Sequence, residues 1–445
     1  VSGFDKDITV TAKVTEPDTI AGLTAKLLGT NMKTVNITDH SSEDGSVFVE
    51  NGDTVDVTTG HTAGGTVDNY YTYTGTSGII DLTNENFGIG PWTDEGAYSA
   101  GSTDKPIEID AQIWSFAVAG SAAPSGFAGS GSLALNWIRN DIDAHITDAT
   151  VTANAGDVAL LASDEASMNV LAGSGAGSGT AAVGVGIAYN YVGGDPDNPA
   201  SANVNTIQAY IDSATVNADA ISIEAKSDAD INALVIAVSG GGTFAANGSI
   251  SLNWIRKDVK AYIGGSAVIT ATGNIDILAM DTSDIRSLSV QLSGSGKVAI
   301  GGAVSYNEIQ NKIRTWINGS ATVTSTGGTI TMKALSEAAI FNVAAGVAGA
   351  GAAAIAGSAS ANVVNNTVET YISAATVTAD KNLYLLADSE NDVTAIVGTI
   401  SAGGAVGVGG AVVVNQLSNT TRAYIDADAT VVAKGSSGTI TIKDW

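Results

Sequence analysis

The feature that most constrains this chain is a motif that occurs six times. Each copy contains an aromatic residue, or His in the first copy, followed by Ile, and these are Ile146, Ile211, Ile263, Ile317, Ile372 and Ile425. Successive Ile residues are 65, 52, 54, 55 and 53 positions apart, and the longest spacing holds an insertion, VGGDPDNPAS, at 192–201. A unit of about 53 residues without helical periodicity cannot bury a face alone, so the copies must stack on one another.

Two columns of amide residues accompany the repeat. Ten residues before the Ile stands the first column, which comprises Asn136, Asn253, Asn307, Asn362 and Asn415, with Asn190 as a displaced equivalent. Four residues later stands the second, which comprises Asn140, Asn311, Asn366 and Asn419, with Lys257 in the odd copy. We expect these amides to stack at a turn and to hydrogen-bond along the axis.

Short strands are predicted after each Ile. Strings such as ATVNADAISIEA alternate apolar and polar residues, which is typical of half-buried strands. The expected inward column is Val151, Val216, Val268, Val323, Val377 and Val431. A Gly/Ala-rich tail then lets opposite walls approach closely.

These patterns predict an all-β fold, an elongated parallel β-solenoid (β-helix) with about two coils per repeat, each rising roughly 4.8 Å. A sandwich of two sheets repeated end to end is the alternative. The expected divisions are a partial solenoid strand region at 1–19, a small inserted β module at 20–105, where the period breaks, and solenoid repeats at 106–445.

Composition excludes several functions. A net charge of −26, from 19 Lys+Arg and 45 Asp+Glu, disfavours nucleic acid, which needs clustered cations. Without cysteine there is neither a disulfide nor a thiolate metal site. The uncharged segment 395–414 is long enough to span a bilayer, but it is rich in Gly and recurs in other repeats. We therefore expect a strand pair there and no stable membrane span.

The repeat resembles those of giant bacterial surface adhesins of the filamentous-haemagglutinin-like and leukotoxin types. The resemblance rests on the unit N-x3-N/K-x4-[aromatic]-I, followed by A-T-V-x-A, x-I-x-I-x-A and the Gly/Ala tail. It covers most of the chain and implies an extracellular β-solenoid with an adhesive or scaffolding role. It implies no catalytic residue.

Candidate chemical groups are few. His40 and His61 sit in polar segments that we expect to be turns, and His145 belongs to the aromatic column. The acids recur at similar repeat positions, and we expect solvated turns there; they include Asp148, Asp164, Glu165, Asp228, Asp230, Asp281, Asp284, Asp388 and Glu390. In the insertion, Asp195, Asp197 and Asn198 resemble the start of a calcium loop without its distal Glu, and they are the candidate Ca²⁺ ligands. We expect no other cofactor.

The sequence favours a non-enzymatic structural or adhesive protein at the cell surface, a rigid acidic segment of a long surface protein or of a self-assembling filament. Its expected partners are other copies or neighbouring repeats, and surface glycans or other cells. One alternative is a polysaccharide-active β-helix enzyme, which needs paired carboxylates in a groove. The other is a membrane-active, toxin-like protein.

Overall fold

The computed structural model describes most of the chain and nearly all of its repeats. The described residues are 2–4, 8–11, 40–42, 46–49, 54–57, 61–66, 69–75, 78–97, 109–153, 156–194, 204–426, 428–434 and 438–444. They form two compact units: Val1–Leu28 with Ile109–Trp445, and Gly29–Glu108. The first unit is the solenoid, and the second spans most of the segment 20–105 in which the sequence period breaks.

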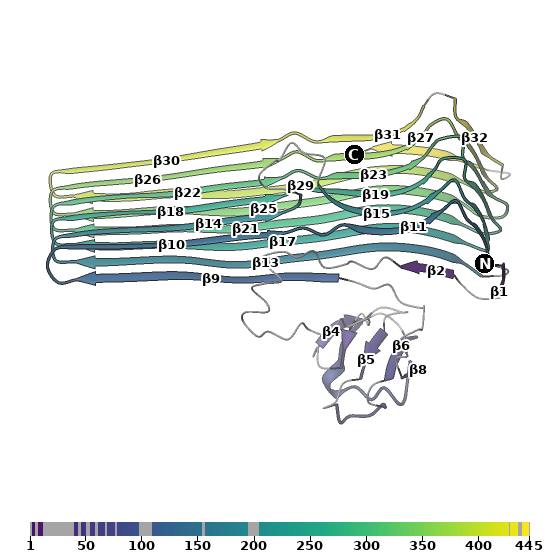
Figure 1. Ribbon diagram of the computed structural model, residues 1–445, viewed down its shortest axis with the longest axis horizontal. Coiled ribbons are helices and arrows are strands. Elements are labelled where there is room, and N and C mark those ends of the chain that lie inside the picture. The colour runs from purple at the N-terminus through teal and green to yellow at the C-terminus, as the bar shows by residue number, and fades with distance from the viewer. Residues whose placement is uncertain are drawn as a thin grey trace. The chain divides into compact units, whose positions relative to one another are not determined.

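The solenoid unit is a parallel β-solenoid built from four sheets (Figure 1). Long strands form one sheet, in the order β2 (Ile8–Thr11), β13 (Val158–Ser178), β17 (Ile221–Gly241), β21 (Ile275–Ser295), β25 (Ile330–Ala350), β29 (Leu383–Gly403) and β33 (Ile440–Asp444), and β9 (Ile109–Ala123) also pairs with β13. Strands of 12 residues form the second sheet, in the order β10 (Phe127–Ile138), β14 (Ala181–Val192), β18 (Phe244–Ile255), β22 (Val298–Ile309), β26 (Ala353–Val364) and β30 (Val406–Leu417).

The other two sheets contain the shorter strands. The third sheet has the order β11 (Ile142–Thr147), β15 (Asn205–Asp212), β19 (Lys257–Gly264), β23 (Lys312–Ile317), β27 (Thr367–Ile372) and β31 (Thr420–Ile425). The fourth has the order β1 (Ser2–Phe4), β12 (Thr150–Ala153), β16 (Thr215–Ala218), β20 (Val268–Ala271), β24 (Thr322–Ser325), β28 (Thr376–Ala379) and β32 (Thr430–Ala433).

Each repeat makes one coil, not the two that we expected. The chain passes once through each sheet before it returns, so Ile221 of β17 pairs with Ile275 of β21, 54 residues later. A strand of 21 residues spans about 70 Å, whereas six coils stack over only about 30 Å. Because one coil uses the whole repeat, this unit is longer along its strands than along its stack.

The long strand and the 12-residue strand of a coil lie face to face. β17 and β18 follow each other through a two-residue turn but belong to different sheets, so they meet through side chains and not through backbone hydrogen bonds. We call the second half of each long strand, its turn and the following 12-residue strand the arm. The rest of the coil is the base. The uncharged segment 395–414 is such an arm, formed by β29, a turn and β30.

The base holds the larger apolar core. Its cluster comprises Ile, Val, Leu and Ala side chains from the first half of each long strand and from the two short sheets. Val151, Val216, Val323 and Val377 lie in this core as expected, and Val431 packs against it. The prediction that Val268 faces inward is wrong, because Val268 pairs with Thr215 and is 45% exposed. Ile269 instead pairs with Val216 and is buried. A shift of one residue turns a strand side chain to the other face.

The inserted unit interrupts one long strand. β2 pairs with Val158–Leu161 of β13, and β9 pairs with Asp164–Ser178 of the same strand. Together β2 and β9 therefore occupy the place of one 21-residue strand, with a gap opposite Ala162 and Ser163. The pairing with β13 resumes at Ile109.

The second unit has its own small core. β3 (His40–Ser41), β5 (Thr54–Asp56), β6 (Asn69–Tyr73) and β8 (Trp92–Ala97) form one sheet, and β4 (Ser46–Val49) pairs with β7 (Gly78–Asp81), which is followed by the 3₁₀ helix η1 (Leu82–Asn84). Tyr71, Phe87 and Trp92 are buried at its centre. His40 lies in strand β3 and not in a turn.

Candidate functional site

The first asparagine column forms a continuous hydrogen-bonded ladder, which we call the asparagine ladder. Each Nδ2 donates to the Oδ1 of the next coil at 2.7–2.9 Å; the members in order are Asn136, Asn190, Asn253, Asn307, Asn362 and Asn415. They face inward from the third-last position of the 12-residue strands, so the expected placement at a turn is wrong. Asn190 is in register with its neighbours, and the insertion follows it.

The asparagine ladder has a direction. Its donors all point toward the C-terminal coil, so Asn136 presents its Oδ1 at one end and Asn415 presents its Nδ2 at the other. Among the described residues no group donates to Asn136 Oδ1 and none accepts from Asn415 Nδ2. Any further coil of the same kind would meet a complementary group at either end.

The second column surrounds a buried polar cluster at the junction of arm and base. Asn311 donates from Nδ2 to Asp281 and Ser283, and its Oδ1 accepts from the backbone N–H of Lys257 at 2.9 Å. Asn140 donates to Asp164 at 2.7 Å, and Asn366 donates to Ser336 at 3.1 Å. Asn366 and Asn419 accept backbone N–H groups of the preceding coil in the same way.

Lys257 is the centre of that cluster. Its Nζ lies 2.8 Å from Asp164 Oδ2 and 2.7 Å from Ser227 Oγ, and the side chains of both ion-pair partners are fully buried. Asp281 is also fully buried, and burial raises the pKa of its carboxyl, while Lys257 and hydrogen bonds with Ser283, Ser227 and Asn311 oppose that shift. Two buried carboxyls thus lie near one cation, and burial favours the protonated form of Asp281.

This location contradicts our expectation for the acids of the long strands, whereas Asp148 lies exposed in the bend between β11 and β12 as expected. Asp164 and Asp281 lie mid-strand and point inward, and Asp228, Asp230 and Asp284 lie mid-strand beside them. The strings ASDEAS and MDTSDI were expected to be turns because they are polar. They belong instead to 21-residue strands that continue into the arm.

The aromatic column stacks on the outside of the third sheet. Neighbouring ring centroids are 4.3–6.0 Å apart and the ring planes are within 13° of parallel; the members are His145, Tyr210, Tyr262, Trp316, Tyr371 and Tyr424. Burial raises the pKa of Tyr262 above its usual range. Because each ring covers the face of the next, this ladder stabilises the stack and leaves few ring faces for a ligand.

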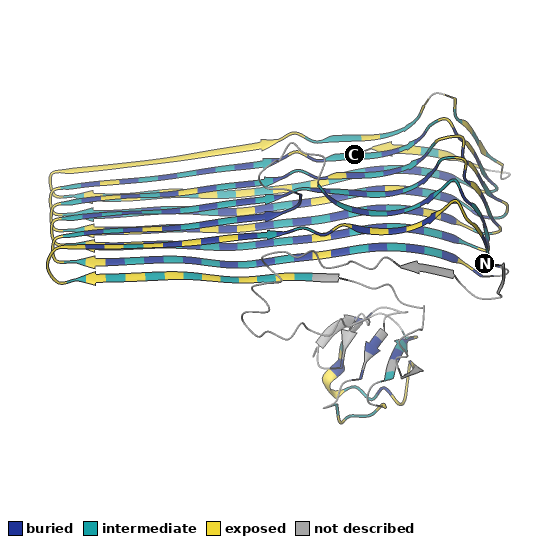
Figure 2. Cartoon of the chain, in the orientation of Figure 1, coloured by how far each residue is buried: buried dark blue, intermediate teal, exposed yellow. Residues whose placement is uncertain are grey.

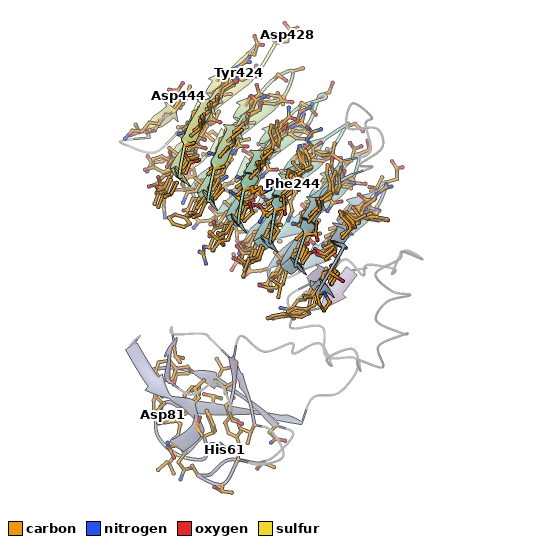
Figure 3. All side chains as sticks on the ribbon, turned by 90° about the vertical axis from the view of Figure 1, so that its left-hand side faces the viewer. His61, Asp81, Phe244, Tyr424, Asp428 and Asp444 are labelled. Atoms are coloured by element: carbon orange, nitrogen blue, oxygen red, sulfur yellow. The ribbon has the colours of Figure 1, made fainter. Side chains whose placement is uncertain are left out.

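Charged side chains beside these rings form pairs between coils. Arg314 binds Asp258 of the preceding coil at 2.8 Å and lies over the Trp316 ring at 5.5 Å. Rows of side chains repeat from coil to coil in the view along the strands (Figure 3).

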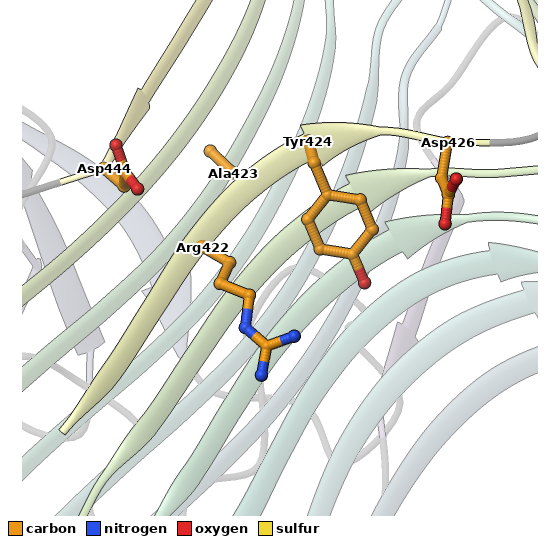
Figure 4. Close-up of a pocket in the computed structure, with 5 residues that line it drawn as sticks. All are labelled: Arg422, Ala423, Tyr424, Asp426 and Asp444. Carbon is orange, nitrogen blue, oxygen red and sulfur yellow. The ribbon is translucent and has the colours of Figure 1, made fainter. Parts of the chain in front are cut away.

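One open pocket lies at the last coil, with a volume of about 410 Å³ (Figure 4). It is lined by Arg422, Ala423, Tyr424, Asp426 and Asp444. Tyr424 is the last member of the aromatic column, and Arg422 pairs with Glu369 of the preceding coil. The pocket is therefore the uncovered end of rows that are filled in earlier coils.

The candidate Ca²⁺ ligands Asp195, Asp197 and Asn198 lie outside the described residues. Within the described ranges, His, Asp and Glu side chains do not gather in groups that could hold a metal ion. In the second unit, His61 bonds to the Glu85 carbonyl at 2.9 Å and packs on Phe87, which are contacts of a structural residue.

Part of the arm interior is polar, which sequence reasoning missed, while Ala, Val, Ile and Met side chains of the same strands form its apolar part. Ser249 and Ser251 of β18 bond across the layer to Ser289 and Ser287 of β21 at 2.9 and 3.0 Å. Gln291 is fully buried there, and its amide has no hydrogen-bond partner among the described residues. The segment SLNWI at 251–255 contains the sequence evidence for this arrangement. Because its Asn is buried, the Leu and Trp on either side of that Asn must face outward.

Comparison with known proteins identifies no relative, so the function of the chain has to be inferred from its fold. No family model, curated protein or solved structure matches this chain. In the part of the chain that the structure describes, no helix has the length and apolar character needed to cross a membrane.

Proposed function

We propose that this chain is a non-enzymatic structural and adhesive segment of an extracellular surface protein, and that its ends join further coils of the same kind. The observation that carries the proposal is the directional asparagine ladder, with an acceptor at Asn136 and a donor at Asn415. The next coil can come from a longer chain or from a second copy.

The last strand of the stack supports this role. β30 is exposed along its whole length, while strands of the inner coils alternate between buried and less buried residues (Figure 2). Exposed edges of parallel strands pair readily with another strand. Rows of like side chains then continue across the junction, as they do between coils of this chain.

The test is assembly of the purified chain, viewed by electron microscopy and measured by sedimentation as concentration rises. We expect end-to-end filaments. Asn415→Asp should weaken them, because its carboxylate still accepts from Asn362 but cannot donate to the next Asn136. Thr331→Asn, on the outward face of β25, is a control that should assemble normally.

Two results would contradict the proposal. One is a chain that remains monomeric at every concentration and that, when displayed on cells, does not hold those cells on glycan-coated or cell-covered surfaces under flow. The other is release of reducing sugar from a polysaccharide, which would favour the β-helix enzyme that the repeat architecture also resembles.

A further inference from the structure

We propose that the outer face of the sheet formed by β10, β14, β18, β22, β26 and β30 docks onto the same face of a second copy. We call this surface the apolar face. Each strand places every second residue outward, as in Phe244, Ile250 and Trp254 of β18. Phe127 is 67% exposed and Ile355 is 44% exposed, so these side chains meet solvent in a single copy.

Charge is almost absent from the apolar face. In these six described strands Glu308 is the one charged residue, and Arg256 neutralises it at 2.7 Å. The whole chain carries −26 charges, so two copies that met through its acidic surfaces would repel each other. The apolar face is a surface through which a second copy can approach without bringing acids together.

A row of glycines crosses the middle of the apolar face. It comprises Gly131, Gly248, Gly302, Gly357 and Gly410, with Val185 in the second coil. A Cβ at Gly302 would meet no atom nearer than 4.0 Å, and one at Gly357 would meet none within 4 Å. The inward Gly184 differs, since its Cβ would lie 2.9 Å from Ser174 Oγ.

The outward glycines are thus not required by the fold of one copy. Glycine within a strand weakens it and often marks close approach of another backbone or ligand. From Gly248 to Gly410 the row lies between outward side chains that include Ile300 on one side and Val304 on the other, and we infer a shallow groove there. A ridge of a second copy fits such a groove when two sheets pack face to face.

The area of the apolar face suits a stable dimer. Six strands about 4.8 Å apart and 12 residues long cover about 1,000 Å². Specific complexes bury about 800 Å² on each partner.

A second copy fits better than a lipid layer. The first and last strands of the sheet, β10 and β30, have open edges, and unpaired backbone groups are not tolerated in hydrocarbon. Fluid acyl chains also give no reason for a fixed groove. Two copies of a sheet satisfy both conditions, because the edges stay in water while the faces pack.

Sedimentation velocity of the full chain tests this proposal, in an Asn415→Asp background that weakens end-to-end joining. We expect a dimer at micromolar concentration. Gly302→Ala should weaken dimerisation at least tenfold without lowering the melting temperature, because the added methyl has room in one copy but fills the groove. Gly302→Lys should give a monomer with the same circular dichroism spectrum, and Thr331→Lys, outward on β25, should leave the dimer intact.

A monomer in the Asn415→Asp background would overturn the proposal, as would a dimer whose affinity is equal in all of these variants. Flotation of a monomer with neutral phosphatidylcholine vesicles, abolished by Gly302→Lys, would assign the apolar face to lipid instead. Each result is independent of the filament test, because joining through the ends and through the apolar face uses different residues.

Discussion

Lys257 occupies a place that Asn residues fill in neighbouring coils, and the residues around it explain the difference. Asn205, Asn311 and Asn366 share its column, while Asp164 and Asp281 share theirs with Ser227, Ser336 and Ser389. A cation accompanies buried carboxyls here, whereas the Asn366–Ser336 pair is neutral. Replacing a whole buried ion pair is often nearly neutral, whereas removing one partner alone is strongly destabilising.

We predict that Lys257→Asn costs about 3–5 kcal/mol of unfolding free energy, because it leaves Asp164 buried without its cation. Lys257→Asn with Asp164→Ser should cost less than Lys257→Asn alone, since both residues then match other coils. Urea unfolding of the four members of the double-mutant cycle measures this. Additive losses would show that the pair does not act as a unit.

Asp281 makes stability depend on pH. Its pKa is raised in the folded chain, so the folded state binds the proton more tightly than the unfolded state does. The stabilisation from this proton is complete below the unfolded pKa, near 3.8, and is lost as pH rises through the folded pKa. We predict that Asp281→Asn stabilises the chain relative to wild type at neutral pH, and that this advantage shrinks toward pH 4.

Urea midpoints across that pH range measure the effect. Asp276→Asn is the matched control, because Asp276 lies exposed on the same strand and should show no such trend. An advantage of Asp281→Asn that is equal at all pH values would contradict a role for the proton.

At the scale of the elements, the asparagine ladder holds each coil to the next by side-chain hydrogen bonds. Asn307 donates to Asn362 and accepts from Asn253, so Asn307→Ala leaves two buried amides with fewer partners. We predict a loss of about 2–6 kcal/mol, at about 1–3 kcal/mol for each of the two groups. Asn217→Ala, on the outer face of β16, should cost much less. Thermal unfolding compares them, and equal losses would contradict a structural role for the ladder.

The strand repeat could be predicted from sequence, because period and alternation are local properties. The Asn and aromatic residues share their columns in the structure because their spacing from the Ile is nearly constant. Coil number could not be predicted, because a Gly/Ala tail reads equally well as several short strands or as two long ones. Only pairing across coils distinguishes these readings.

Facing direction was harder to predict in the arm than in the base. In the base, Ile and Val alternate with polar residues, and the apolar residues are the buried ones, as expected for a half-buried strand. In β18 of the arm, Ser and Asn point inward and Leu and Trp outward, so hydropathy alone gives the wrong face for that strand. The prediction for Val268 failed for a related reason: Val268 and Ile269 are adjacent and both apolar, so hydropathy does not tell which of them faces the core.

At the scale of the whole molecule, the second unit is an insertion into a strand that is otherwise continuous. We predict that replacing residues 12–108 by two residues, Ala-Ser, joins β2 to β9 as one 21-residue strand and preserves the solenoid. The melting temperature should then stay close to that of the parent chain. A chain that no longer folds would show that the second unit contributes to the solenoid.

The central claim is that each repeat is one coil, so that equivalent residues of successive repeats are adjacent. The chain has no cysteine, and Thr270 pairs with Thr324 on the outer face of β20 and β24. We predict that Thr270→Cys with Thr324→Cys forms an intramolecular disulfide on mild oxidation, detected by mass spectrometry, because adjacent strands bring the two Cα atoms to about 4.8 Å. Thr270→Cys with Val323→Cys should not, because Val323 faces inward. Failure of the first pair to link in the folded chain, as two coils per repeat would require, would contradict the account.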